Sequence, residues 1–272
     1  LLDLRYLGLP LVDVDGQRFG VDTGFLVFNE RTYPKLIALF AELGVDSVAS
    51  DMSFSVKAPR AGGRTLEWAG SNLDTAFVQR SNLFSPRFLK MVREILRFNK
   101  EATALAGDGG AMPQQSLGQY LDARGYSAEF RNWYLLPMAA CIWSCPSGQM
   151  LAFPVAAFIR FCHIHGLLQV NDRPQWRTVR GGSRVYVDKL LAAIPSRRLV
   201  MPVQSVTRAA QAGARSVRVE TAAGAEQFDQ VVLACHSDQA LALLADARAD
   251  ERAVLGAIRY QPNRAVLHTD AR

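Results

Sequence analysis

A short run near the start of the chain has the composition of a site that contacts a flat ligand. A predicted strand ends in the sequence Asp22-Thr23-Gly24, and the apolar residues Phe25 and Leu26 follow it directly. Because glycine has no Cβ, the backbone at Gly24 can approach a ring closely or turn with a positive φ. The apolar residues would then line the floor of the site. An ordinary strand–turn–helix junction has the same pattern, so this run alone leaves both interpretations open.

Cysteine and histidine side chains in a predicted helix that ends at His165 raise the question of metal or acid–base chemistry. Cys162, His163 and His165 lie in this helix, and Cys141 and Cys145 precede it. Their spacing contains no Cys-x-x-Cys pair and does not match a zinc site, so we predict no metal centre. Two histidines at positions i and i+2 cannot share a helix face. One would face a substrate pocket and the other solvent, or either would be purely structural.

Large aromatic residues gather between about residues 50 and 170, where they suggest an apolar pocket for a hydrophobic substrate. Tyr134, Trp143 and His163 are our candidates for its lining. Trp176, which precedes a Gly-Gly pair, is a candidate for stacking on a ligand. Aromatic side chains commonly pack in the core, and that alternative stays open for each of them. No acid–base pair is evident, so the catalytic residues stay unassigned.

Periodicity and turn signals predict the elements that would position these residues in the first 170 positions. The chain should begin with a hairpin around Asp15-Gly16, continue with a helix, and then form a second hairpin and a block of helices. The long helix that starts at Pro86 should bury Phe88, Met91, Val92, Ile95 and Leu96. The expected elements are the strands 12–15, 18–22, 52–56 and 64–68, and helices over 32–43, from 86, from 116 to Gly125, over 127–141 with a kink at Pro137, and over 153–165.

The pattern changes after residue 170, where strands alternate with helices. Gly181-Gly182 precedes a predicted helix, and the expected strands are 199–201, 203–208, 217–220, 229–234 and 264–269. The run 229–234 is continuously apolar and rich in β-branched residues, as is typical of a strand buried on both faces of a parallel sheet. Ala234 and Cys235 end it, and a helix follows. Strand ends of this kind bind nucleotides in open α/β sheets.

The composition limits the classes of function. The chain has 272 residues, 49% hydrophobic content and a net charge of +6 spread over scattered arginines. No basic block or RNA-binding motif is present, which disfavours nucleic acid as a partner. No apolar run reaches the roughly 18 residues of a spanning helix, although a basic face would suit acidic substrates or peripheral contact with an anionic membrane. Four cysteines without a disulfide pattern favour the cytoplasm.

Several motifs, taken in order, resemble one known family. They are Val21–Gly24, Gly181-Gly182, Pro202–Val206 and Val231–His236. These motifs resemble the segments of the discontinuous FAD domain in the flavin-containing amine oxidoreductase superfamily. Longer runs, at 133–140, 142–146, 162–168, 173–178 and 234–240, are similar to its bacterial predicted NAD/FAD-binding subfamily of FAD-dependent oxidoreductases.

The resemblance implies an α/β fold, α+β overall. A discontinuous and incomplete Rossmann-like FAD/NAD(P)-binding domain would carry an inserted substrate domain of sheet and helices. Residues 1–50 and 171–247 would form the FAD part, and 51–170 with 248–272 the substrate or cap part. The FAD contacts implied by the resemblance are Asp22, Thr23, Gly24, Phe25, Leu26, Gly181, Gly182, Val203, Ala234 and Cys235, with Val203 meeting the adenine end through its backbone.

The chain also departs from the family pattern. It contains no Gly-x-Gly-x-x-Gly and lacks the C-terminal segment that closes over the flavin, and it begins at Leu1 rather than at a methionine. We therefore expect a fragment whose parent binds FAD, while this polypeptide binds it weakly or not at all and is inactive alone. The resemblance implies hydride transfer from an apolar or amine-bearing small molecule to flavin N5. The alternative is a non-catalytic module that binds a lipid or a partner. The substrate, the electron acceptor and the oligomeric state stay open.

Overall fold

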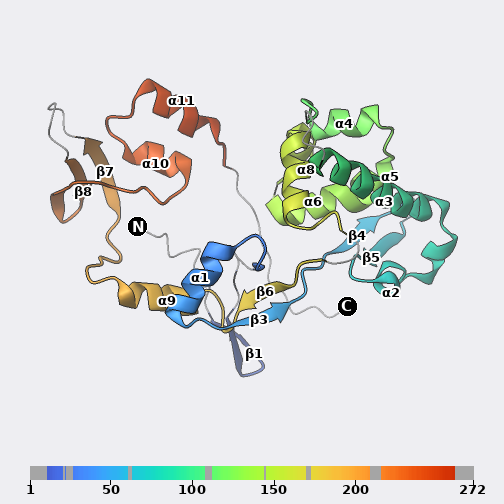
Figure 1. Cartoon of the computed structure of the whole chain (residues 1–272), viewed down its shortest axis with the longest axis horizontal. Helices are drawn as coiled ribbons and strands as arrows, with labels where there is room; N and C mark the ends of the chain where they lie inside the picture. The colour runs from blue at the N-terminus through green and yellow to red at the C-terminus, as the bar shows by residue number, and fades with distance from the viewer. Residues whose placement is uncertain are drawn as a thin grey trace. The chain divides into compact units, whose positions relative to one another are not determined.

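Two compact units make up the chain in a computed structural model (Figure 1). The first comprises Leu1–Leu26, Glu42–Asp46 and Val179–Arg272, and the second comprises Val27–Ala41 and Ser47–Thr178. The residues that the structure describes are 11–20, 22, 27–60, 63–107, 112–143, 145–169, 173–208 and 216–260.

The units do not follow the boundaries expected from the sequence. Residues 27–41 belong to the second unit, and the helix α11 (Ala249–Ala257) belongs to the first unit, where it packs against α10 (Ser237–Leu243). The assignment of one part to the cofactor and the other to the substrate stays a prediction. The mixed helix-and-sheet class is confirmed.

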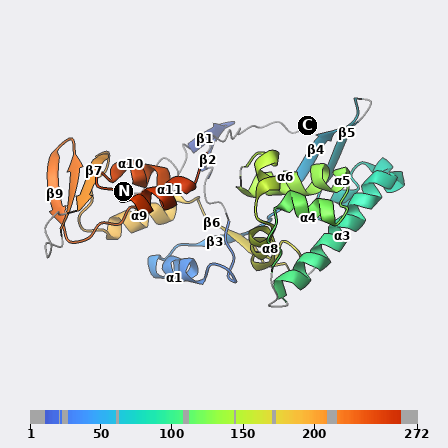
Figure 2. The same ribbon diagram turned by 90° about the horizontal axis from the view of Figure 1, so that it is seen from above.

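The second unit is a block of helices around one apolar core, joined by a hairpin. Figure 2 shows α3 (Pro86–Gly107) running along one side of this unit. The other elements of the block are β4 (Ser55–Pro59), β5 (Thr65–Ala69), α2 (Leu73–Ala76), the 3-10 turn η2 (Arg80–Phe84), α4 (Leu117–Ala123), α5 (Ala128–Phe130), α6 (Leu136–Trp143), α7 (Ser147–Ala152) and α8 (Val155–Ile164). The hairpin of β4 and β5 and the helices predicted from capping and periodicity are confirmed.

The buried face of α3 explains both the success and the error of its predicted pattern. Phe88 and Met91 are fully buried, as the helical spacing predicts. Leu96, expected in the same stripe, is 53% exposed. It lies on the far side of the helix from Phe98, which is in the core. An apolar residue on a helix is buried only if its face meets the core, so the expectation for Leu96 was wrong.

The predicted kink at Pro137 is a π-helical turn, η3 (Arg131–Leu135), placed between α5 and α6. Proline has no N–H, so residue 137 cannot donate to the carbonyl of Trp133 one helical turn earlier. The indole Nε1 of Trp68 donates to that carbonyl instead, at 3.0 Å. A side chain from β5 therefore satisfies the group that the proline leaves without its helical partner.

The capping and glycine patterns of the sequence also predicted the ends of α4 and α8 correctly. The Ser116 side chain accepts from the backbone N–H of Gln119 at 3.2 Å, and the Gln119 side chain accepts from the N–H of Ser116 at 2.9 Å. Gly125 and Gly166 follow α4 and α8 with φ of 64° and 70°. The predicted capping box and both glycine stops are thus confirmed.

A short two-stranded sheet within the chain pairs β3 (Ser47–Ser50) with β6 (Trp176–Val179). Phe28 extends it through a bridge to Arg177, with N–H to O distances of 2.9 and 2.8 Å. The helix α1 (Pro34–Leu43) follows Phe28, whose buried ring packs edge-on against Phe40. The sequence predicted the helix but not the strand β6.

The described residues of the first unit form small antiparallel sheets and three helices. The predicted hairpin pairs β1 (Leu11–Val14) with β2 (Gln17–Gly20), and Asp15 and Gly16 turn between them with positive φ. A second sheet has the order β7 (Val203–Arg208), β8 (Val217–Thr221) and β9 (Gly224–Phe228). The helices are α9 (Arg184–Ala193), α10 and α11.

Two predicted strands of this unit are absent from the described residues. Residues 229–234 have no regular structure, and Val232 is 84% exposed. Residues 199–201 are also irregular, with Val200 fully exposed at a φ of 58°. An apolar run becomes a buried strand only when neighbouring strands take up its backbone groups, and no described strand pairs with either run. The predicted strand 264–269 lies outside the described residues. None of the described helices has an apolar stretch that would let it cross a membrane.

Candidate functional site

The start of α9 brings together two segments that the sequence singled out separately. Both oxygens of the Asp22 carboxylate accept the backbone N–H of Ser183, at 3.0 and 2.9 Å, and one also accepts the Ser183 hydroxyl, at 3.1 Å. Gly181 and Gly182, just before, have φ of 84° and 89°. Residues other than glycine rarely adopt a positive φ of this size. The backbone just before α9 therefore requires glycine at both positions. Asp22, Gly181 and Gly182 thus form one local structure.

The charge at this helix start bears on what it can bind. A helix N-terminus attracts anions because its first N–H groups have no partner within the helix. At α9 the Asp22 carboxylate already takes that place at Ser183. Burial raises the pKa of the nearby Tyr186 hydroxyl, and its hydrogen bond with Ser183 acts in the opposite direction. The backbone at the start of α9 is therefore better suited to contact a ligand through its shape than to bind the phosphate groups of a ligand.

The other residues implied as cofactor contacts lie in several places. Thr23, Gly24, Phe25 and Leu26 lie outside the described residues. Val203 is half-buried at the start of β7, an edge strand with backbone groups on its outer side. Ala234 is exposed and Cys235 half-buried in the irregular segment before α10.

The second unit contains a row of neighbouring rings, which we call the aromatic row: Trp143, Phe161, His165 and Trp176. The ring centroids are 4.6 Å apart for Trp143 and Phe161, 4.1 Å for Phe161 and His165, and 6.3 Å for His165 and Trp176. His165 lies nearly parallel to Trp176, at 9°. Tyr33 adds an edge contact to His165. The row joins the predicted candidates Trp143 and Trp176 through a histidine that was not among the chosen candidates.

His165 holds one ring nitrogen in place and leaves the other available. Its Nδ1 lies 3.0 Å from the carbonyl oxygen of Phe161, which assigns the proton to Nδ1 and the acceptor lone pair to Nε2. No described residue makes a polar contact with Nε2. His163, the candidate chosen from the sequence, is exposed on the last turn of α8. The sequence contains one sign of this contact: Phe161 and His165 are four residues apart, so their side chains are neighbours on one face of the helix.

Polar atoms without partners lie in the same unit. Gln169 Oε1 is buried and has no hydrogen-bond partner. A Cβ built on Gly166 would come 3.2 Å from that oxygen and 3.0 Å from Arg31 Nη2. Asn29 is fully buried, and its Oδ1 accepts from the N–H groups of Arg31 and Thr32, yet its Nδ2 has no partner. An unpaired buried polar atom costs roughly 1–3 kcal/mol, so both atoms are candidates for contact with a ligand or water.

The remaining candidates have structural surroundings. Tyr134 is in the core, with ring centroids 5.6 Å from Phe130 and 6.0 Å from Phe54, and burial raises its pKa. Burial also raises the pKa of the Cys162 thiol to about 12, so it stays protonated. No group of three or more metal-binding side chains occurs within the described ranges.

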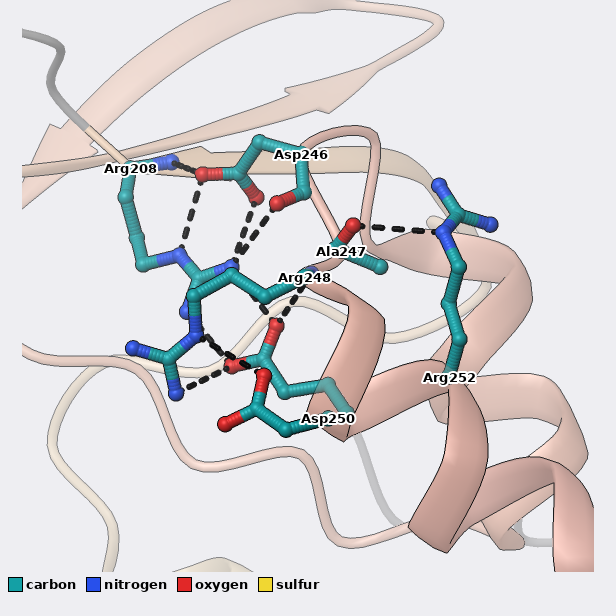
Figure 3. A network of polar contacts seen from close by, with 7 residues as sticks. Arg208, Asp246, Ala247, Arg248, Asp250 and Arg252 are labelled. Carbon is teal, nitrogen blue, oxygen red and sulfur yellow. Dashed lines mark hydrogen bonds and ion pairs between the residues drawn. The ribbon is translucent and has the colours of Figure 1, made fainter.

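A hollow beside Arg208 in the first unit is lined by Thr207, Arg208, Ser216, Arg218 and Gln227 and has a volume of about 130 Å³. Typical ligand pockets have roughly 300–1,000 Å³. The Arg208 guanidinium also forms hydrogen bonds with Asp246 and Glu251. Those with Asp246 are drawn in Figure 3. We therefore assign no ligand to this hollow.

Comparisons with known proteins found similarity of fold but not of sequence family. No protein-family model and no curated protein matches the chain. A redesigned putrescine oxidase has a TM-score of 0.62 at 17% identity, over 92% of this chain and 55% of its own. Cyclohexylamine oxidase from Brevibacterium oxydans IH-35A has 0.62 at 19%, over 88% and 52%. A putative protoporphyrinogen oxidase from Exiguobacterium sp. 255-15 has 0.51 at 19%, over 86% and 52%. The chain therefore shares its fold with amine oxidases and spans about half the length of these structures.

Proposed function

We propose that the chain is part of an FAD-dependent oxidoreductase that takes a hydride from a C–H bond of an apolar or amine-bearing small molecule. The observation that carries this proposal is the amine-oxidase fold, which extends over about nine-tenths of the chain. The order of its motifs supports the same family, and the bacterial predicted NAD/FAD-binding subfamily is our proposal within it.

The residues of this chain would contact a flavin cofactor through main-chain groups rather than through charged side chains. Gly181 and Gly182, with their positive φ, and the edge-strand residue Val203 would offer main-chain contacts. The run 23–26 and the pair Ala234 and Cys235 would complete the contacts that the resemblance implies. A bound flavin supplies the electron acceptor for the hydride.

Within the second unit, the aromatic row would offer a surface for an apolar or amine-bearing molecule. Phe161 and Trp176 offer apolar faces that exclude water from a bound molecule. The Nε2 lone pair of His165 would accept a proton from a substrate ammonium, since an amine must lose its charge before it gives up a hydride. Gln169 Oε1 would accept a hydrogen bond that positions the substrate.

The alternative, a non-catalytic binding module on the same scaffold, has one observation in its favour. Asp22 fills the helix start at Ser183, so the described residues include no free helix N-terminus there for a pyrophosphate.

The decisive test compares the purified chain with the product of the complete reading frame. We expect a flavin absorbance spectrum from the complete product and weak or absent binding by the chain alone. Gly182→Ala should reduce the flavin content because alanine strains a φ of 89°. Gly148→Ala, where nothing lies within 4 Å of the new Cβ, is the matched control. A colourless complete product without FAD would support the binding module.

His165 can be tested in that flavin-loaded protein by anaerobic reduction with a panel of amines. His165→Leu should slow reduction by about 10²–10⁴-fold, while His163→Leu on the exposed turn should change little. Equal reduction rates in both variants would exclude His165 from the chemistry.

A further inference from the structure

One segment of the second unit exposes apolar side chains in an unusual concentration. Of the fifteen exposed large hydrophobic residues in the described structure, six lie between residues 73 and 96. Phe84 is 85% exposed and Leu73 is 79% exposed. We call this surface the basic–apolar face; its apolar members are Leu73, Val78, Leu83, Phe84, Leu89 and Leu96. Large exposed apolar side chains close together in sequence are typical of an interaction site when they share a surface.

The same face is strongly cationic. Residues 73–100 contain six basic residues and two acidic ones, a net charge of +4 in a chain whose total is +6. All six basic side chains are exposed: Arg80, Arg87, Lys90, Arg93, Arg97 and Lys100. Of the two acidic residues, Asp74 pairs with Arg80, and Glu94 is buried and accepts from Ser127. Arg87 and Arg97 pair with Glu129 and Glu101, which lie outside this range. Within the described structure, the unpaired positive charge of the face therefore comes from Lys90, Arg93 and Lys100.

Helical geometry aligns the two kinds of side chain on α3. Leu89, Arg93, Leu96 and Lys100 stand at i, i+4, i+7 and i+11, so they form one stripe along the helix. The opposite side carries the buried core residues of α3. Lys90, Arg93 and Lys100 have no ion-pair partner among the described residues. The stripe alternates apolar and cationic side chains and faces away from the core.

We propose that the basic–apolar face binds the surface of an anionic lipid bilayer. Interfacial helices bury Leu and Phe at the boundary between headgroups and acyl chains, while Lys and Arg contact anionic headgroups. Phe84, Leu73 and the α3 stripe supply both parts. A second copy of the chain is disfavoured as the occupant because it would bring a second +4 face against the first. The proposal goes beyond the proposed function and needs no cofactor, so either can fail alone.

The test is co-sedimentation of the purified chain with vesicles of phosphatidylcholine or of phosphatidylcholine mixed with phosphatidylglycerol. We expect binding to the mixed vesicles, weakened by salt, and much less binding to the neutral ones. Arg93→Gln with Lys100→Gln should lower the partition coefficient by about fivefold per charge removed. Phe84→Ser with Leu73→Ser should lower it by at least about tenfold.

Matched controls are Val254→Ser on α11, where the valine is 66% exposed, and Lys35→Gln on α1. All these side chains are at the surface, so the variants should keep the unfolding midpoint of the parent. Three outcomes would overturn the proposal: no binding to mixed vesicles, equal binding to both vesicle types, or equal losses in the control variants. Self-association that Phe84→Ser abolishes would assign the face to a second copy and would also overturn it.

Discussion

Asp22 is the residue through which the first unit ties its N-terminal segment to α9. Its hydrogen bonds to Ser183 cross 161 positions of sequence. The carboxylate accepts both a backbone N–H and a hydroxyl, and such charge-assisted bonds are stronger than neutral ones. The cofactor role implied by the resemblance and the capping contact are compatible, because the contact holds Gly181 and Gly182 in their positive-φ conformation.

We predict that Asp22→Ala lowers the free energy of unfolding of the first unit by about 1–2 kcal/mol, as expected for the loss of a helix-capping side chain. Asp22→Asn should lose less because an amide oxygen still accepts from Ser183. Asp188→Ala on the same helix, whose side chain is 63% exposed, should stay within about 0.5 kcal/mol. Urea unfolding measures all three. Equal values for the two alanine variants would contradict the capping role.

Cys162 gives the second unit a pH dependence in the alkaline range. Burial raises the pKa of this thiol from 9.0 to about 12. Below pH 9 the thiol is protonated in both states, and between pH 9 and 12 it ionises in the unfolded chain first. Stability should therefore fall as the pH rises through this window, by at most about 1.4 kcal/mol per pH unit from this group.

We expect Cys162→Ala to show a smaller loss of stability than the parent between about pH 9 and pH 10, because the tyrosines are the same in both proteins and only the parent has the buried thiol. Urea midpoints at the two pH values provide the measurement. Cys141→Ala, at an exposed position, serves as the control and should behave like the parent. The same slope in parent and Cys162→Ala would rule out the buried thiol as the cause.

Among the elements, the sheet of β7, β8 and β9 is joined by Arg208 to α11 and to the loop that precedes it. The Arg208 guanidinium pairs with both Asp246 and Glu251, with Nη1 2.6 Å from Glu251 Oε1 and Nε 2.9 Å from Asp246 Oδ2. Figure 3 shows the contacts of Arg208 with Asp246. The Arg208 hydrogen bonds and the N–H of Arg248 hold the pKa of Glu251 at about 2, below its ordinary 4.5. A depressed carboxyl pKa stabilises the fold above pH 4.5, and this contribution is lost as the pH falls from 4.5 to about 2.

Glu251→Gln should therefore remove part of the acid sensitivity of the first unit. We expect the variant to be less stable than the parent at neutral pH and to approach it at low pH. Circular dichroism during acid titration at low and high salt gives the comparison, with Asp250→Asn, 69% exposed, as the control. A constant difference between variant and parent across the titration would show that the ion pairs are not its source.

For the whole molecule, the two units differ in how much apolar surface they bury. Within the described structure the main core cluster lies in the second unit and includes fully buried rings such as Phe88, Phe130 and Phe158. The first unit buries Val179, Val187, Val206 and Ala240, and all five residues of β9 are exposed. Local stability follows buried apolar contacts.

We predict that hydrogen exchange is slowest in α3 and α8 and much faster in β8 and β9. Mass spectrometry of peptides from the exchanged chain would resolve the two units. Equal protection in both would show that the first unit draws stability from a source other than its described core.

The sequence by itself determined the local features of this protein. Capping at Ser116, the π-helical turn before Pro137, the hairpin at Asp15-Gly16 and the core face of α3 all follow from interactions within a few residues. The family motifs also predicted the fold class that the structure shares with amine oxidases.

The tertiary structure decided what depends on distant partners. Residues 229–234 have every local property of a buried strand, yet a strand needs a neighbouring strand for its hydrogen bonds, and none of the described ones provides it. Whether Leu96 is buried, and whether His163 or His165 joins the aromatic row, depends on which helix face meets the core. The contact of Asp22 with Ser183 likewise joins segments 161 positions apart. The local sequence pattern determines whether a segment has helical or strand periodicity. Which other elements it packs against is determined only by the tertiary structure.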